Sequence, residues 1–351
     1  MDEYTQRIEK IEAELGRWLP EHPDADWAAK VFPGLEGRVS PELLESLTES
    51  GWDLLNRGGK RWRPLLMTLI CETLGGGDAA LPLTPLVEFC HNASLIHDDI
   101  EDNSDERRGK PAVHLLYGID TAINGGAFLY FLPLACIDAW AAPIEQKEHI
   151  RSVWGEYMRR LHLGQAMDIR WHRDFSSLPG IEEYYTMCGL KTGCLARFAA
   201  VMGAAVAYTA DTNAVGPAEI LGEAAEKLGV GFQILDDVKN LTTGLPGKKR
   251  GDDVVEGKKS LPVLLYLHRR PAGKELVSRC FAAARAGGTG VPEVEELIRA
   301  LETAGVVEEA RQKGLTLIRE AGDVFAAPSI AAFPLREEGR RLLAGLIGLI
   351  S

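Results

Sequence analysis

Hydrophobic residues recur along most of this chain at the spacing of helix faces. In residues 4–19, Ile11 and Leu15 lie four positions apart, which places them on one side of a helix. Ser40 and Pro41 supply an N-cap and a first-turn proline for the next helix. The same criteria predict a long succession of helices. The expected ranges are 4–19, 41–56, 61–75, 82–103, 117–139, 144–171, 180–209, 215–242, 258–269, 273–286, 292–303, 305–325 and 333–350.

Strand signals are weak, because no segment alternates convincingly between apolar and polar residues. Glycine-rich breaks separate the helices, and a loop rich in Pro, Asp and Gly runs up to Ser40. No internal repeat or low-complexity linker interrupts the pattern. We therefore expect an all-α fold, with an N-terminal helix and loop extension at 1–40 and one helical domain at 41–351.

The composition is that of a soluble globular protein, with 46% hydrophobic and 26% charged residues among 351. A net charge of −12 argues against a nucleic-acid partner. The basic residues nevertheless gather in local islands, which favours a small anionic ligand. These islands are Lys60-Arg61 with Arg63, Arg107-Arg108 with Lys110, Lys248-Lys249-Arg250, and Lys258-Lys259.

The six cysteines form no C-x-x-C pair and lie mostly in apolar helical segments, as expected for reduced thiols in a cytoplasmic protein. The first residues are acidic and polar, unlike a signal peptide. The longest apolar stretch, 198–210, is shorter than a membrane-spanning helix. We therefore expect a cytoplasmic location without stable membrane insertion.

Two acidic clusters each follow an apolar helical segment. In the first, Asp98 and Asp102 are four residues apart and so share a helix face. Like charges at this spacing destabilise a bare helix, and a magnesium ion offsets the repulsion because it prefers carboxylate and phosphate oxygens. The second cluster contains Asp236 and Asp237, with Gln233 one turn earlier. Together the clusters predict the two halves of a magnesium–pyrophosphate site.

The basic islands supply further groups for a pyrophosphate. Lys60 and Arg63 follow two glycines at an expected helix start, where free backbone N–H groups also attract anions. Arg107 and Arg108 can hold phosphate oxygens through paired hydrogen bonds. The segment 247–251 is expected to be a cationic flap, in which either lysine could bind phosphate.

This set of motifs resembles the trans-isoprenyl diphosphate synthase family over residues 58–268. The first Asp-rich motif spans Asp98–Gly109 and is complete, while the second spans Asp236–Asn240 and ends in Asn where many members have Asp. Details at residues 91–95, 99–104 and 167–171 are most similar to geranylgeranyl diphosphate synthases of the eukaryotic type. The other matching elements are Gly58-Gly59-Lys60-Arg61-Trp62-Arg63-Pro64, Gly164-Gln165-Ala166-Met167-Asp168 and Lys191-Thr192.

The resemblance implies a helical isoprenoid-synthase bundle with a central active-site cavity. It also implies a Mg²⁺-dependent reaction, with about three ions, that condenses isopentenyl diphosphate with allylic diphosphates. The implied catalytic residues are Asp98, Asp102, Lys191, Thr192, Gln233 and Asp236. The implied metal ligands are Asp98, Asp99, Asp102, Asp168, Asp236 and Asp237. The implied substrate-binding residues are Gly59, Lys60, Arg63, His91, Arg107, Arg108, Gln165, Lys248, Lys249 and Lys258.

Product length is expected to depend on the helix before the first acidic cluster, where each turn spans about 5.4 Å, comparable to one isoprene unit. Ala93 and Ser94 lie one turn before Asp98 and are small, which leaves a passage open. Phe89 and Cys90 lie one turn further and could form its floor. These residues favour a geranylgeranyl product, with farnesyl or longer polyprenyl diphosphates as alternatives.

Two other functions share part of this pattern. A terpene cyclase would keep the first motif but lack the second Asp pair and the isopentenyl diphosphate residues. A non-catalytic subunit of a heteromeric prenyltransferase would lack one Asp-rich motif. Both motifs are intact here, which favours the synthase. The resemblance further implies a homodimer, whose interface the sequence does not define.

Overall fold

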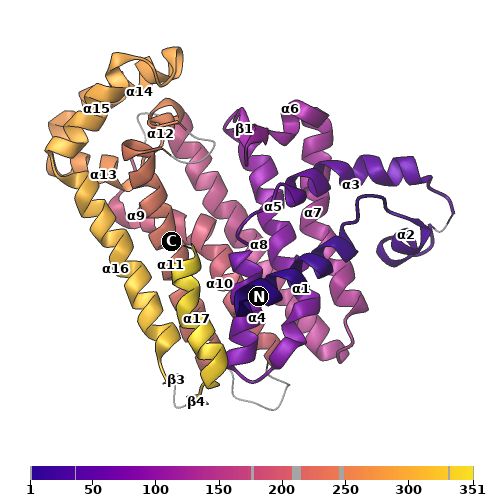
Figure 1. The fold of residues 1–351 in the computed structure, drawn as a ribbon. Coiled ribbons are helices and arrows are strands. Elements are labelled where there is room, and N and C mark those ends of the chain that lie inside the picture. Colours follow the sequence, from indigo (N-terminus) through magenta and orange to yellow (C-terminus); the bar gives the residue numbers. More distant parts are fainter. Residues whose placement is uncertain are drawn as a thin grey trace. The chain divides into compact units, whose positions relative to one another are not determined.

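The computed structural model describes residues 2–35, 37–174, 178–207, 215–244, 249–330 and 333–350, and these fold almost entirely into helices (Figure 1). The α-helices are α1 (Glu3–Trp18), α2 (Ala25–Val31), α3 (Pro41–Asn56), α4 (Trp62–Thr73), α5 (Pro85–Glu101), α6 (Val113–Tyr117), α7 (Ile119–Ala139), α8 (Ile144–Arg173), α9 (Ile181–Cys188), α10 (Cys194–Ala207), α11 (Val215–Thr242), α12 (Asp252–Glu256), α13 (Leu261–Arg269), α14 (Lys274–Gly287), α15 (Pro292–Thr303), α16 (Val306–Ala326) and α17 (Glu337–Ile350). The remaining helical turns are η1 (Gly77–Leu83), η2 (Gly189–Gly193) and η3 (Pro271–Gly273).

The strands of the described residues form two short antiparallel hairpins. One pairs β1 (Glu106–Arg107) with β2 (Lys110–Pro111), and the other pairs β3 (Ser329–Ile330) with β4 (Phe333–Pro334). The predicted all-α fold is therefore confirmed.

The chain divides into two compact units, each built from separate stretches of sequence. Unit 1 comprises Met1–Glu156, Arg197–Gly222 and Asp323–Ser351, and unit 2 comprises Tyr157–Ala196 and Glu223–Gly322.

Unit 1 is organised around α5, which packs mainly against α7 and also contacts α3 and α4. Its inward side chains have no exposed surface, among them Val87, Phe89 and Ile96. Because α5 is buried along most of its length, the acidic residues at its carboxyl end are held on a rigid element.

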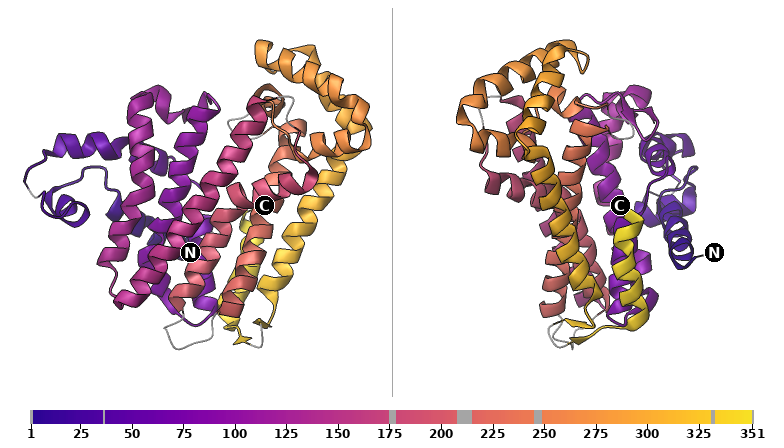
Figure 2. Two further views of the ribbon diagram at one scale, coloured as in Figure 1. Left: turned by 180° about the vertical axis from the view of Figure 1, so that it is seen from behind. Right: turned by 60° about the vertical axis from the view of Figure 1, so that its left-hand side comes forward.

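Unit 2 has a separate hydrophobic core. Tyr184 of α9, Ile234 of α11 and Phe281 of α14 are all buried in it. In both views of Figure 2, α14 and α15 (orange) lie side by side, in agreement with their contacts. This core anchors the helix that carries the second acidic cluster.

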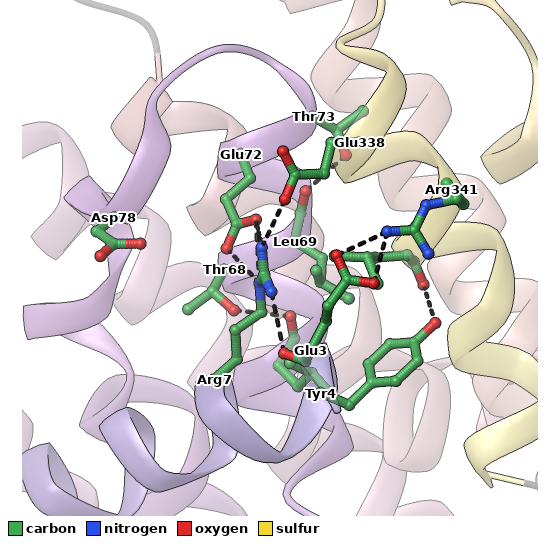
Figure 3. A network of polar contacts seen from close by, with 12 residues as sticks. Glu3, Tyr4, Arg7, Thr68, Leu69, Glu72, Thr73, Asp78, Glu338 and Arg341 are labelled. Carbon is green, nitrogen blue, oxygen red and sulfur yellow. Dashed lines mark hydrogen bonds and ion pairs between the residues drawn. The ribbon is translucent and has the colours of Figure 1, made fainter. Parts of the chain in front are cut away.

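Helices α1 and α17 are fastened to α4 by a polar network (Figure 3). Arg7 of α1 donates to the Glu72 carboxylate of α4 from Nε at 2.9 Å and from Nη2 at 2.7 Å. Arg341 of α17 holds the Glu3 carboxylate at 2.6 and 2.7 Å. The N-terminal helix is thus an integral part of unit 1.

Most predicted helices are confirmed within a few residues, but some short elements were not predicted. The loop expected before Ser40 contains α2, which begins at the N-cap Asp24, whose side chain accepts from the Trp27 N–H at 2.8 Å. Helices α6 and α12 and both hairpins were also not predicted. The proposed boundary at residue 40 stays a prediction.

Among the described residues, α7 and the continuous helix Ile181–Ala207 are long and apolar enough to cross a membrane by length and composition. Of their most apolar windows, 56% and 61% respectively are buried inside the protein. More than half of each window therefore packs inside the protein.

Candidate active site

The predicted site residues fall into two groups, one in each unit. In unit 1, Asp98 and Asp102 lie at the carboxyl end of α5, where the Asp102 N–H donates to the Asp98 carbonyl at 2.9 Å. Both side chains are partly exposed. One helical turn therefore separates two accessible carboxylates, the hard oxygen donors that magnesium prefers.

Asp99, between them, has a different environment. Its side chain has no exposed surface, and the Arg107 Nε donates to its two oxygens at 3.0 and 3.1 Å. Burial is the largest influence and lowers the pKa of Arg107, but the bonds to Asp99 together with the charges of Asp99, Asp98 and Asp102 outweigh it, and the pKa is raised. Asp99 thus fixes Arg107 beside the accessible carboxylates, and its role as a metal ligand stays a prediction.

Arg107 and Arg108 lie on the β1–β2 hairpin rather than on a helix. Arg108 and Gly109 form its two-residue turn, with φ angles of 53° and 75°. Consecutive positive φ angles define a type I′ turn, which glycine adopts easily and arginine does not. The Arg108 Nη1 donates to the Leu54 carbonyl at 3.0 Å and to the Asn92 Oδ1 at 3.3 Å, which stabilises this conformation.

The segment before α4 brings further predicted residues close to Arg108. A side chain added to Gly59, whose φ is 143°, would lie 3.3 Å from the Arg108 Nη2. Arg63 stacks on Trp62, with 4.4 Å between its Cζ and the ring centroid, and its Nη1 is 3.4 Å from the His91 Nε2. Gly59 thus lies beside Arg108 and Arg63 beside His91, and the charges of Arg63 and Arg108 both act on His91, so the four residues form one neighbourhood.

His91 is held neutral in this cationic neighbourhood. Burial, followed by the charges of Arg63 and Arg108, lowers its pKa well below the usual 6.5. A neutral imidazole can donate one hydrogen bond and accept another.

Lys60 has an exposed side chain, and its Nζ donates to the backbone carbonyl of Ile350 at the end of α17. The carboxyl end of a helix carries partial negative charge, which favours this contact. The predicted isopentenyl diphosphate residue thus has a protein partner on a helix remote in sequence.

In unit 2, Lys191 and Thr192 lie on η2, a π-helical turn between α9 and α10. The Lys191 Nζ donates to the Asp168 Oδ2 of α8 at 2.6 Å. This approach requires Gly164, because a Cβ there would lie 2.5 Å from the Lys191 backbone nitrogen. Single π-turns within α-helices are frequent at functional sites.

A hydrogen-bonded chain connects η2 with the second acidic cluster. Thr192 Oγ1 donates to Gln233 Oε1 at 2.7 Å, and Gln233 Nε2 donates to Asp237 Oδ1 at 3.0 Å. The Tyr184 hydroxyl donates to the other Asp237 oxygen at 2.7 Å. Burial raises the pKa of Asp237, while the bonds from Tyr184 and Gln233 oppose that shift.

Asp236 is exposed on α11, whereas Asp237 is buried. Glycine before this pair allows close packing, because a Cβ on Gly229 would lie 2.8 Å from the Gly193 Cα. Asn240, which ends the second motif, is buried, and its Oδ1 accepts from the Asp253 N–H at 3.1 Å and so orders the start of α12. Asp236 is the accessible carboxylate of this motif.

The remaining cationic residues are only partly described. Lys248 lies outside the described residues. Lys249 is exposed, and its backbone N–H donates to the Asp252 Oδ2 at 2.6 Å. Lys258 pairs with Glu256 at 2.6 Å, and Gln165 is partly exposed on α8. Their substrate-binding roles stay predictions.

The predicted chain-length residues all lie on α5. Phe89, Cys90 and Ala93 have no exposed surface, and the Ser94 Oγ donates to the His91 carbonyl at 2.8 Å. Their influence on product length stays a prediction.

Within the described ranges, no three His, Cys, Asp or Glu side chains form a metal-binding cluster. Asp98 and Asp102 in unit 1 and Asp236 in unit 2 nevertheless present accessible carboxylates. Magnesium usually retains waters and takes one or two carboxylates together with substrate phosphates. The donor set therefore fits magnesium delivered with a diphosphate.

The sequence predicted no individual role for Glu88, Asn92 or Tyr184, and placed Arg61 only in a basic island. Asn92 bonds to Arg108 and Tyr184 bonds to Asp237, whereas Arg61 and Glu88 are joined to Arg108 through Asn92. Glu88 and Asn92 lie ten and six residues before Asp98 on α5. The sequence signal for Glu88 was its charge within the apolar segment 85–90, which indicates a buried partner of opposite charge.

Comparisons with known proteins identify the family of this chain. Residues 44–300 match the family model of polyprenyl synthetase. A geranylgeranyl pyrophosphate synthase of Apiospora sacchari is 36% identical over 274 residues, which cover 76% of this chain and 76% of that protein. A geranylfarnesyl diphosphate synthase of Aeropyrum pernix is 29% identical over 321 residues, covering 89% and 95% respectively. The crystal structure of geranylgeranyl pyrophosphate synthetase from Pyrococcus horikoshii Ot3 has a TM-score of 0.80 at 27% identity, covering 99% of this chain and 96% of that chain.

Proposed function

This chain belongs to the polyprenyl synthetase family and is a trans-prenyltransferase, and we propose that its main product is geranylgeranyl diphosphate. The supporting observation is the pair of small residues Ala93 and Ser94, one turn before Asp98 on α5. Large side chains there would restrict a growing prenyl chain. Farnesyl or longer polyprenyl diphosphates are the alternative products, and a geranylfarnesyl diphosphate synthase is among the relatives.

Magnesium is the proposed cofactor, with about three ions bound through carboxylate and diphosphate oxygens. Asp98, Asp102 and Asp236 would hold it, since their carboxylates are accessible. When bound, the ions neutralise the charge that develops on departing pyrophosphate. Asp99, Asp168 and Asp237 act in this proposal chiefly by holding Arg107, Lys191 and Gln233.

The reaction begins when the allylic carbon–oxygen bond breaks and leaves an allylic cation and pyrophosphate. Arg107, Lys191 and Lys258, with the lysines of the flap, bind the diphosphate through charge-assisted hydrogen bonds. Thr192 and Gln233 present hydroxyl and amide dipoles near the cation. Their mutual hydrogen bond of 2.7 Å fixes both side chains in advance.

Isopentenyl diphosphate occupies the cationic neighbourhood of Gly59, Lys60, Arg63, His91 and Arg108. Its double bond forms the new carbon–carbon bond with the allylic cation. The resulting cation loses a proton to the released pyrophosphate, so the double bond reforms without a side-chain base. Neutral His91 suits this site because it can bond to phosphate without further crowding of positive charge.

A homodimer is the proposed assembly. Apolar side chains on α6 and α7 are about half exposed or more, a pattern typical of an interface. They are Leu115 (56%), Leu116 (49%), Ile119 (56%), Ile123 (48%) and Phe131 (59%). A cytoplasmic location is proposed because all six cysteines are buried thiols.

The test is to incubate the purified protein with magnesium, isopentenyl diphosphate and allylic diphosphates of five, ten or fifteen carbons. Product lengths are then read by mass spectrometry. A dominant twenty-carbon diphosphate supports the proposal. A product of another length would overturn the chain-length argument but leave the reaction in place. Absence of condensation with every starter would favour the non-catalytic subunit.

A further inference from the structure

Arg61 is a buried cation beside the proposed isopentenyl diphosphate residues. Its side chain is 2% exposed, and its φ of 47° is in the left-handed region. The guanidinium donates from Nη1 to Glu88 at 2.8 Å, from Nε to Glu12 at 2.7 Å and from Nη2 to the Leu55 carbonyl at 2.5 Å. Three acceptors on different elements therefore fix one arginine.

Glu88 extends this arrangement along α5. Its Oε1 accepts from Arg61 and also from the Asn92 Nδ2 at 3.0 Å. The other end of the same amide, Asn92 Oδ1, accepts from Arg108 at 3.3 Å. A continuous chain of hydrogen bonds thus runs from Arg61 through Glu88 and Asn92 to Arg108.

Gly59 brings the two ends of this chain together. A Cβ on Gly59 would lie 3.3 Å from both the Arg61 Nη1 and the Arg108 Nη2. The two guanidinium groups therefore flank the same glycine. Two nitrogens that each lie 3.3 Å from one point are at most about 6.6 Å apart, so their like charges repel, and the nearby Glu88 carboxylate offsets the repulsion.

The electrostatics agree with this geometry. Burial lowers the pKa of Arg108 to about 10, the Glu88 charge opposes that shift, and the charges of Arg61 and Arg107 add to it. Arg108 stays protonated at neutral pH. Glu88 is 2% exposed, so solvent screens its charge only weakly.

We infer that Glu88, acting through Arg61 and Asn92, is a positioning residue that sets Arg108 and Gly59 for the diphosphate of isopentenyl diphosphate. This inference rests on the proposed function. Glu88 does not touch the substrate; it holds two left-handed residues in place and keeps their charges close. Loss of the Glu88 charge therefore weakens binding of isopentenyl diphosphate but not of the allylic diphosphate.

The test is the variant Glu88→Gln, which keeps the side-chain shape and an acceptor oxygen. Isopentenyl diphosphate does not react without an allylic partner, so calorimetry can measure its binding alone. We expect its dissociation constant and KM to rise about tenfold or more, the effect of weakening one charge-assisted hydrogen bond. The KM for the allylic diphosphate should change less than about twofold.

Glu72→Gln is the matched control, because Glu72 also lies on a core helix and binds an arginine, Arg7 of α1 (Figure 3). It should lower the melting temperature and leave both KM values unchanged.

Glu12→Gln tests the same hydrogen-bonded chain through the other carboxylate that binds Arg61, since the Glu12 side chain is 43% exposed. We expect it to weaken isopentenyl diphosphate binding by a smaller factor while the fold stays intact.

The outcomes separate the alternatives. If Glu88→Gln and Glu12→Gln lower only the melting temperature, Glu88 has a purely structural role and the inference is wrong. Equal increases in both KM values would also overturn it. If the wild-type protein neither binds isopentenyl diphosphate nor condenses it, the proposed function itself fails. If Glu88→Gln does not fold, the Glu12→Gln result decides.

Discussion

Arg107 holds the buried carboxylate of Asp99 through its Nε, at 3.0 and 3.1 Å from the two oxygens. Removal of one charge from a buried pair leaves the other uncompensated. We predict that Asp99→Asn lowers the free energy of unfolding by about 3 kcal/mol. Thermal denaturation would measure the change, and an unaltered melting temperature would contradict it.

Asp98→Asn should reduce activity and leave stability nearly unchanged, in contrast to Asp99→Asn. Its carboxylate is partly exposed and is proposed to hold magnesium, so turnover should fall at least about 100-fold while the melting temperature stays close to wild type. Steady-state kinetics with isopentenyl and allylic diphosphates measure this. Asp105→Asn, an exposed acid in the same segment, is the control. Activity retained by Asp98→Asn would refute the metal assignment.

Ala93→Phe should shorten the product. Ala93 is completely buried, and a ring at this depth of α5 would block chain growth one turn from Asp98. Overpacking is also expected to cost about 1–3 kcal/mol of stability. Mass spectrometry of the products decides: an unchanged length distribution from a folded variant would mean that the chain grows elsewhere.

Tyr184→Phe should destabilise unit 2. The lost hydroxyl leaves one oxygen of buried Asp237 without its 2.7 Å donor, which should cost about 1.5–3 kcal/mol. Melting temperatures of the variant and of Tyr185→Phe provide the comparison, since Tyr185 packs edge-on against Tyr184 with ring centroids 5.9 Å apart. Equal melting temperatures for both variants would argue against the Asp237 bond.

His91 should contribute a pH dependence to stability. Burial and nearby guanidinium groups hold its folded pKa well below 6.5, whereas the unfolded chain binds a proton near 6.5. Its contribution is therefore complete above pH 6.5 and is lost as the pH falls below that value. Melting temperatures of wild type and His91→Gln between pH 7.5 and 5 should converge at the acidic end. Parallel curves would show that His91 titrates normally.

The sequence alone was sufficient for the helices with strong periodicity and for the acidic clusters. Helix α5 illustrates this, because its apolar run ends in Asp98 and Asp102 and the structure buries most of that run. The family was also identified from motifs that lie far apart in the chain.

Features that depend on tertiary contacts were missed. The β1–β2 turn places Arg108 at a positive φ, which no arginine adopts by local preference. It is stabilised by Leu54 and Asn92, which precede it in the sequence by 54 and 16 residues. The role of Glu88 was missed for the same reason, since it accepts from Arg61, 27 residues earlier, and reaches Arg108 only through Asn92.

The π-helical turn η2 has a consequence for how this chain tolerates changes in length. A π-turn contains one residue more than an α-turn. Deletion of one residue between Gly189 and Gly193 would restore an unbroken α-helix and rotate one flank by roughly 100° about the axis. Lys191 and Thr192 could then no longer face Asp168 and Gln233 together. Within the helix 181–207, the residues before and after η2 therefore differ in their rotation about the helix axis. A single-residue deletion would be far more harmful here than in a surface loop.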